Sequence, residues 1–314
     1  MIKLRGKDML FIEAHTHIWD KLDGRRFDTM TNKPIRCGQT QIGDKVVQFL
    51  PPEWYDLRSP FEVYQLYEKR LGFDKAVLLQ TPCYGPQYEY VNEVIAKHPG
   101  KYVTVGVPDP QDKNSYLETA RLCLGEYKYK GLKFESPDIP FDMVAPENAF
   151  VFESILEYDA YCMIDLGWDN GPEDFPIDAM HTIVKRYQDL TFIFPHMGIS
   201  HFWDPKEHNA GYPSLRRTLD MLALNKNIWF DLSGIPMLVS EFEEYPFPAV
   251  GRILKVAQEY NALDRVMWGS DYPTAMKAST YKQCVECVTN HCDFISDDDM
   301  EKIMGLTAEK VWFS

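Results

Sequence analysis

The sequence predicts an α/β fold: a (β/α)8 barrel of the TIM type, with parallel strands. Eight short apolar runs of strand length recur along the 314 residues, and segments with helical patterning lie between them. The runs are nearly continuous rather than alternating, which is typical of strands buried on both faces. Strand–helix alternation repeated eight times favours a parallel sheet closed as a barrel, with a doubly wound open sheet as the main alternative.

Most of the eight predicted strands are rich in Val, Ile, Phe and Leu. The eight are Met9–Ala14, Lys75–Gln80, Tyr102–Val107, Gly131–Phe134, Cys162–Leu166, Thr191–Phe194, Ile228–Leu232 and Arg265–Trp268. Helical segments separate or follow them, and several have Pro or Ser near the first turn, a common start signal. They are Pro60–Leu71, Tyr88–His98, Asn114–Tyr127, Glu147–Tyr158, Ile177–Tyr187, Ser214–Leu224, Ala249–Asn261 and Tyr281–Asn290.

One interval, residues 20–59, interrupts this order. It follows the first strand directly, is rich in Gly, Pro and polar residues, and lacks clear periodicity. In a barrel that position lies over the C-terminal mouth, where active sites are found, and a loop this long is usually functional. We therefore expect one domain over residues 1–314, with 20–59 as an insertion on the active-site side.

Composition excludes some partners. The net charge of −14 argues against nucleic acid, because phosphate binding needs a basic face. Apolar stretches of membrane-spanning length are absent. The odd number of cysteines, seven, in a long chain argues against a disulfide framework and favours a reducing compartment, so we expect a cytoplasmic protein with a small-molecule substrate.

The strongest local pattern is a pair of histidines at the end of the first strand. Residues two apart on a strand share a face, so His15 and His17 point the same way. Imidazole is the commonest metal ligand in proteins. Two such rings held by one strand make half of a zinc-type site. A chance His-x-His on a polar strand end remains the alternative.

Two later strands also deliver polar side chains to the same mouth. Asp271 follows the eighth strand in Gly269-Ser270-Asp271, and strand eight of a closed barrel pairs with strand one, beside His15 and His17. Otherwise Asp271 caps a turn. His196 follows the sixth strand, where it is either a proton-transfer group or a hydrogen-bonded structural histidine.

With these residues the chain resembles the amidohydrolase superfamily. Within it, the chain looks most like the group that includes aminocarboxymuconate-semialdehyde decarboxylase, resorcylate-type decarboxylases and several lactonases. The resemblance rests on His15 and His17, on His196 and on the Gly-Ser-Asp-Tyr-Pro around Asp271, and it spans nearly the whole chain. It implies one divalent metal ion, expected to be zinc with manganese or magnesium as alternatives, and it leaves a homodimer open.

The chain departs from that group at Asp165. The resemblance implies a metal-binding histidine ending the fifth strand, where this sequence has Ile164-Asp165-Leu166-Gly167. Asp165 is expected to replace that ligand, since carboxylate suits Zn²⁺ and is preferred by Mn²⁺ and Mg²⁺. Alternatively the ligand is lost and His196 or water replaces it, or this member has no metal.

Substrate contacts are expected from three further residues near the mouth. Lys133 ends the fourth strand and offers a cation for a substrate carboxylate, or is a structural residue. Trp19 and His201 follow the first and sixth strands, where Trp19 contributes to an aromatic density that suggests a planar or cyclic ligand.

The function that we predict is hydrolysis of an ester, lactone or amide, with Asp271 and His196 as the catalytic proton-transfer residues. Non-oxidative decarboxylation of an unsaturated or aromatic acid uses the same residues and is the alternative. A non-catalytic barrel that binds a small ligand is the third hypothesis, and it predicts no bound metal.

Overall fold

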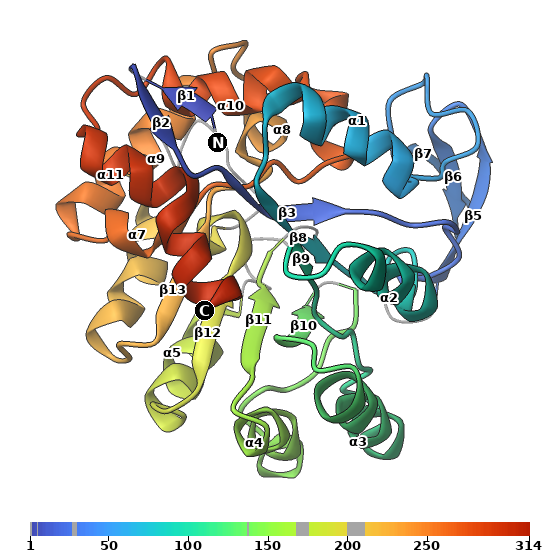
Figure 1. The fold of residues 1–314 in the computed structure, drawn as a ribbon. Helices are drawn as coiled ribbons and strands as arrows, with labels where there is room; N and C mark the ends of the chain where they lie inside the picture. Colours follow the sequence, from blue (N-terminus) through green and yellow to red (C-terminus); the bar gives the residue numbers. More distant parts are fainter. Residues whose placement is uncertain (1, 5, 27–29, 137, 168–175, 200–210) are drawn as a thin grey trace.

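A barrel of parallel strands with helices around it forms the centre of the molecule (Figure 1). The computed structural model describes residues 2–4, 6–26, 30–136, 138–167, 176–199 and 211–314. Within these ranges the barrel strands each overlap one predicted run. They are β3 (Ile12–His17), β8 (Lys75–Leu79), β9 (Tyr102–Val103), β10 (Gly131–Glu135), β11 (Tyr161–Asp165), β12 (Thr191–Phe194), β13 (Ile228–Asp231) and β14 (Val266–Met267).

Backbone pairing closes this set of strands into a ring. Hydrogen bonds join β3–β8–β9 and β10–β11–β12–β13–β14 as two parallel sheets. At one seam a parallel bridge pairs Gly106, just after β9, with Leu132 of β10. At the other, Thr16 pairs with Tyr272, and the His17 N–H donates to the Tyr272 carbonyl over 2.8 Å. The strands therefore form a barrel rather than an open sheet.

Alternate residues of the barrel strands contribute to two different hydrophobic clusters. One fills the barrel interior, and the other lies between the strands and the helices. The interior cluster also takes in the C-terminal segment η8 (Glu309–Phe313), whose Trp312 is fully buried. Interior residues from the strands and from the residues just after β9 are Ile12, Ala14, Val77, Leu79, Val105, Met163, Ile193, Trp229 and Met267.

The helices lie close to the expected positions. The longer ones are α1 (Phe61–Leu71), α2 (Tyr88–Lys97), α3 (Lys113–Ala120), α4 (Phe150–Glu157), α5 (Ile177–Arg186), α7 (Pro213–Asp220), α9 (Pro248–Glu259) and α10 (Tyr281–Thr289). Short α8 (Ile235–Val239) and α11 (Asp297–Glu301) add to them, and η1 (Arg121–Glu126) and η7 (Lys302–Leu306) continue α3 and α11. Among the described helices none is long and apolar enough to cross a membrane.

The first strand differs from its predicted range of 9–14. Met9 ends a separate strand, β2 (Lys7–Met9), which pairs antiparallel with β1 (Ile2–Leu4), and the barrel strand β3 starts at Ile12. One apolar run thus serves two strands, and periodicity alone cannot show where one ends and the next begins. The shift carries β3 through both histidines of the predicted metal site.

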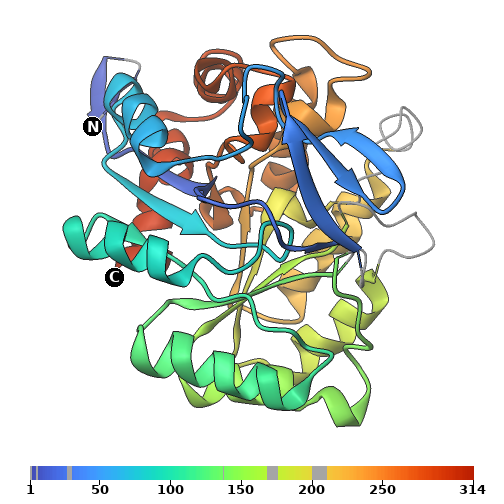
Figure 2. The same ribbon diagram turned by 90° about the vertical axis from the view of Figure 1, so that its right-hand side faces the viewer.

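Residues 20–59 contain a small sheet rather than loop alone. It is formed by β4 (Arg25–Arg26), β5 (Met30–Arg36), β6 (Gln39–Ile42) and β7 (Lys45–Gln48), paired antiparallel. In Figure 2 this sheet stands on the side toward which the arrows of β3 and β8 point. Its β5 and β7 are largely exposed, so the apolar alternation that would reveal them in the sequence is missing.

Candidate active site

The histidine pair faces the barrel interior because β3 carries one extra residue. Glu13 pairs with Ala76 and Thr16 with Leu78, so three steps along β3 match two along β8. Strict alternation would place the histidines on the opposite face from Ala14, toward the helices. The extra residue, a β-bulge, instead lets neighbouring Ala14 and His15 both point inward.

Hydrogen bonds determine the tautomer of both rings. The Asp231 carboxylate accepts from Nδ1 of His15 over 2.9 Å. Nδ1 of His17 lies 3.1 Å from the Leu79 carbonyl and 2.8 Å from the Tyr84 hydroxyl, which itself donates to Leu79. Since neither partner of His17 can donate, Nδ1 carries the proton in both rings, and both Nε2 atoms present lone pairs.

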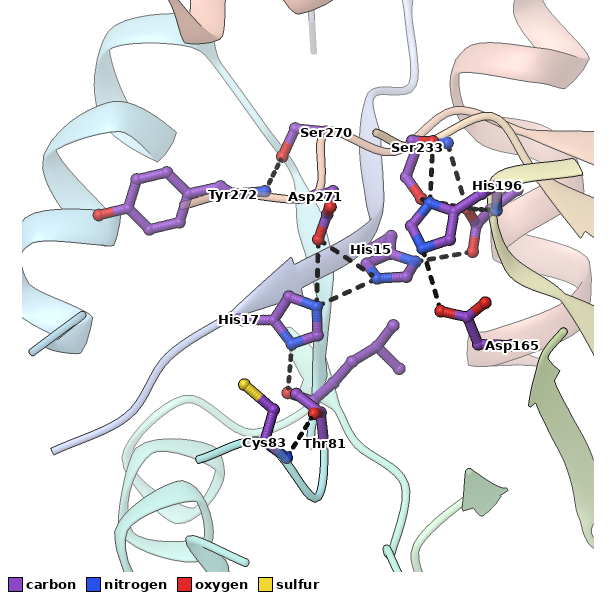
Figure 3. A network of polar contacts seen from close by, with 12 residues as sticks. His15, His17, Thr81, Cys83, Asp165, His196, Ser233, Ser270, Asp271 and Tyr272 are labelled. Carbon is purple, nitrogen blue, oxygen red and sulfur yellow. Dashed lines mark hydrogen bonds and ion pairs between the residues drawn. The ribbon is translucent and has the colours of Figure 1, made fainter. Parts of the chain in front are cut away.

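These lone pairs converge with a carboxylate (Figure 3). The two Nε2 atoms are 3.1 Å apart, and Oδ1 of Asp271 lies 3.3 Å from Nε2 of His17 and 3.7 Å from Nε2 of His15. Burial lowers the pKa of His17 to about 4, which keeps its ring neutral. Three buried acceptors without a proton between them fit a cation, and two imidazoles with a carboxylate are a donor set for zinc.

Asp271 reaches this position through an unusual backbone. Its φ is 63°, and its N–H donates to the His15 carbonyl over 2.9 Å. Non-glycine residues in this left-handed region are uncommon and concentrate at functional sites. Before this turn, the backbone at Gly269 packs closely against β3: a Cβ added at Gly269 would lie 2.7 Å from Cβ of His15.

This close approach predicts the effect of Gly269→Ala. The new methyl group would push His15 or β3 away, so we expect a loss of about 1–3 kcal/mol in the free energy of unfolding. Urea denaturation measures it. Gly251→Ala in α9 is the matched control, because its Cβ would meet Cys292 and Phe294 at an ordinary 3.6–3.7 Å. An unchanged midpoint for Gly269→Ala would contradict the packing described.

His196 follows β12 in a left-handed conformation with φ 54°. Its Nδ1 lies 3.0 Å from the Ser233 carbonyl, which only accepts, and its Nε2 lies 3.6 Å from the Asp165 carboxylate. Burial lowers its pKa, but Asp165 outweighs burial and raises the pKa to about 9. Both ring nitrogens therefore carry protons, and His196 is a cationic acid.

Among the described residues, two groups bring three metal-ligand atoms within 4.8 Å of one another. They are His15–His17–Asp271 and His15–His196–Asp231. In the second group, protons on His15 Nδ1 and on the His196 ring occupy the positions that a metal ion would need. Only the first group therefore offers lone pairs to a metal ion. Asp165 belongs to neither: it accepts from the Gly167 N–H over 3.2 Å and faces His196.

Sequence reasoning missed Asp231, the last residue of β13. It is fully buried, accepts from His15, and also accepts from the His196 N–H over 3.1 Å. Burial raises its pKa, but His15 and His196 lower it more, so Asp231 is ionised. The available signal was a lone carboxylate ending an apolar strand at the mouth of the barrel.

The three predicted substrate contacts have different positions. Lys133 faces the interior, is 2% exposed and pairs with Glu135 over 2.8 Å. Trp19 is 1% exposed, stacks on Tyr84 with ring centroids 4.6 Å apart, and donates to the Leu57 carbonyl. His201 lies outside the described residues.

The charges of the site are unequal. Four side chains carry negative charge and two carry positive charge. The cations are Lys133 and protonated His196, and the carboxylates are Glu135, Asp165, Asp231 and Asp271. Buried charge needs compensation, because removing ions from water costs several kcal/mol each. A divalent cation between the two histidines and Asp271 would balance this excess of two negative charges.

Comparisons with known sequences found a matching family and a similar protein. A family model described as Amidohydrolase matches residues 12–313. A curated relative, the 4-sulfomuconolactone hydrolase of Hydrogenophaga intermedia, is 22% identical over 233 residues, which cover 72% of this chain and 67% of the relative.

Solved structures share the whole fold. A probable 2-pyrone-4,6-dicarboxylic acid hydrolase from Acinetobacter baumannii, with citric acid bound, superposes with a TM-score of 0.67 at 14% identity, covering 97% of this chain and 99% of the other. An amidohydrolase from Burkholderia multivorans with bound zinc gives 0.67 at 15% identity, covering 96% and 99%. These likenesses confirm the predicted barrel.

Proposed function

The chain belongs to the amidohydrolase family, and on this premise we propose that it is a metal-dependent hydrolase of a small cyclic ester, with the metal held by His15, His17 and Asp271. The observation that carries the proposal is that three buried acceptors converge. They are the Nε2 atoms of His15 and His17, whose rings carry their protons on Nδ1, and Oδ1 of Asp271. The lactone hydrolases among the similar proteins support a lactone as the substrate class. Other esters and amides are attacked by the same chemistry.

The donor set fits one divalent ion. Such an ion supplies Lewis-acid activation of water and of a carbonyl oxygen. Zinc is the first choice, because imidazole is a good zinc ligand and a similar protein binds zinc, whereas the carboxylate leaves manganese and magnesium as alternatives. Asp231 and the Leu79 carbonyl orient the two rings, as outer partners of metal-bound histidines generally do.

Proton transfer is assigned to two charged residues that interact with each other, Asp271 and His196. The Asp271 carboxylate accepts a proton from the attacking water as its oxygen bonds to the carbonyl carbon of the substrate. His196 donates the proton on Nε2 to the ring oxygen as the carbon–oxygen bond of the lactone breaks. Proton transfer from Asp271 to His196 then restores both residues, and the product is a hydroxy acid.

Asp165 is given a role different from the one the resemblance implies. Because it faces His196, we propose that it keeps that ring protonated and oriented, rather than acting first as a metal ligand. Lys133 is assigned to a carboxylate of the substrate, since it is a buried cation on the interior face of β10. These two assignments suit a substrate that is both a lactone and an acid.

Residues 20–59 are proposed to complete the site within one domain of 1–314. Phe49, Leu50 and Leu57 pack with Trp19 and Tyr84 in one buried cluster. Tyr84 contacts His17 directly, so this cluster supports the ligand pair from the side of the insertion.

Metal content tests the proposal. We expect about one divalent ion per purified chain, well below one after His17→Ala, and an unchanged content after His98→Ala, whose ring contacts Phe61 and Tyr102. Elemental analysis measures this, alongside lactone opening followed in a pH-stat. Absence of metal from all three proteins would overturn the metal mechanism.

Decarboxylation of an unsaturated acid is the second candidate, favoured by the protonated His196, which could deliver H⁺ to carbon, and by Lys133, which could hold a carboxylate. Turnover in ¹⁸O-labelled water separates the two reactions. Hydrolysis puts the label into the product, whereas decarboxylation releases CO₂ without incorporating water.

A further inference from the structure

The extra residue of β3 has to be held in place. A bulge leaves one residue outside the ladder of backbone hydrogen bonds, and the His15 N–H is satisfied by a side chain instead. Oε1 of Glu13 accepts from that N–H over 2.9 Å. Glu13 is fully buried, and the mechanism above gives it no role.

The same carboxyl group joins β3 to the opposite side of the seam. Oε1 also accepts from the Ser270 N–H over 2.9 Å, next to Asp271. Oε2 accepts from the Tyr281 hydroxyl of α10 over 2.7 Å. Three donors from three segments therefore meet on Glu13, and two of them belong to residues at or beside the metal site.

We propose that Glu13 is a positioning residue that fixes the bulge of β3 and thereby turns His15 into the barrel, in register with Asp271. Without the bulge, the period of two would direct the histidines toward the helices. Glu13 thus acts through backbone geometry and does not touch the metal or the substrate. The zinc measurement below rests on the proposed function, but the measurement of ring orientation does not.

A purely structural role is the alternative, and the chain offers a matched control for it. Glu68 of α1 is also buried and accepts from the Tyr102 hydroxyl over 2.7 Å and from Lys101 over 2.8 Å. Glu68→Gln changes a comparable buried carboxylate–tyrosine contact without touching β3. It should lower stability and leave the histidines unchanged.

The test observes the histidine rings in the metal-free protein. The chain has eight histidines, so ¹⁵N-histidine labelling gives few ring signals, and His15→Gln assigns the signals of His15. We expect wild type, Glu68→Gln and Glu13→Gln to keep the Nδ1–H form of His15. Gln retains an acceptor for both N–H groups, and the Tyr281 hydroxyl can rotate to accept from the new amide. In Glu13→Ala the His15 signals should move toward those of a free ring.

Zinc titration gives the second readout. Glu13→Ala should bind zinc about 10–100-fold more weakly, the usual effect of losing an outer partner of a ligand, whereas Glu13→Gln should stay within about threefold of wild type. If Glu13→Ala does not fold, Glu13→Leu replaces it, because leucine fills more of the buried volume and likewise offers no acceptor to the His15 N–H, and we expect the same direction of change.

Two outcomes overturn the proposal. One is a folded Glu13→Ala, or Glu13→Leu used in its place, with unchanged His15 signals. The other is a Glu68→Gln that shifts those signals as much as the Glu13 variant does. A wild-type protein that binds no zinc would refute the proposed function, yet the ring signals would still decide the role of Glu13.

Discussion

Asp271→Asn should abolish turnover and make the metal-free protein more stable. The amide keeps the shape of the side chain. In the wild type, Nε2 of His15 and Nε2 of His17 face only acceptors, whereas the NH₂ of the new amide can donate to their lone pairs. The variant thereby fills the position of the cation with a hydrogen-bond donor. We expect kcat/KM to fall by about 10⁴-fold, the upper end for a lost proton-transfer group, together with loss of stoichiometric metal.

Stability distinguishes this explanation from simple damage. Removing a buried charge and adding a donor should raise the melting temperature of the chelator-treated protein by about 3 °C, measured by calorimetry. Asp271→Ala is the control, because it also loses the metal but supplies no donor, and it should melt below the Asn variant. If metal-free Asp271→Asn melted lower than Asp271→Ala, the three acceptors could not be converging as described.

The fold could be predicted because each barrel strand can be recognised separately in the sequence. Runs such as Cys162–Leu166 and Thr191–Phe194 are buried on both faces, so they appear as uninterrupted apolar segments, and the observed β11 and β12 coincide with them to within one residue. The exposed strands β5 and β7 carry no such signal and were expected as loop. A strand could therefore be recognised in the sequence when it was buried, and not simply because it is a strand.

Part of the site could also be predicted, because some of its residues lie in recognisable local motifs. His15, His17, His196 and Asp271 stand at strand ends in short polar motifs that can be seen locally. The bulge that orients the first pair could not be seen, because it depends on pairing with β8. Asp231 orients His15 and His196, which are distant from it in sequence, so this role could be seen only in the structure.

Deprotonation of His196 should set the alkaline limit of activity. Its pKa of about 9 lies above the ordinary value of 6.5, so the acid is available at neutral pH and is lost as pH rises through 9. We expect kcat/KM to fall on that limb, and His196→Gln to remove the limb and lower the rate at neutral pH by about 10²–10⁴-fold. A pH profile of kcat/KM measures both, because it reports the groups of the free enzyme.

Asp165 determines where that limb lies. Asp165→Asn removes the carboxylate that stabilises the imidazolium, so the limb should move to lower pH by about 1–2 units. Because the folded-state pKa exceeds the unfolded one, the pairing stabilises the fold fully below pH 6.5, and this contribution disappears as pH rises through about 9. Wild type should therefore lose part of its stability advantage over Asp165→Asn across that interval. A limb that does not move in Asp165→Asn would mean that His196 does not depend on this carboxylate, and Asp165 would then return to consideration as a metal ligand.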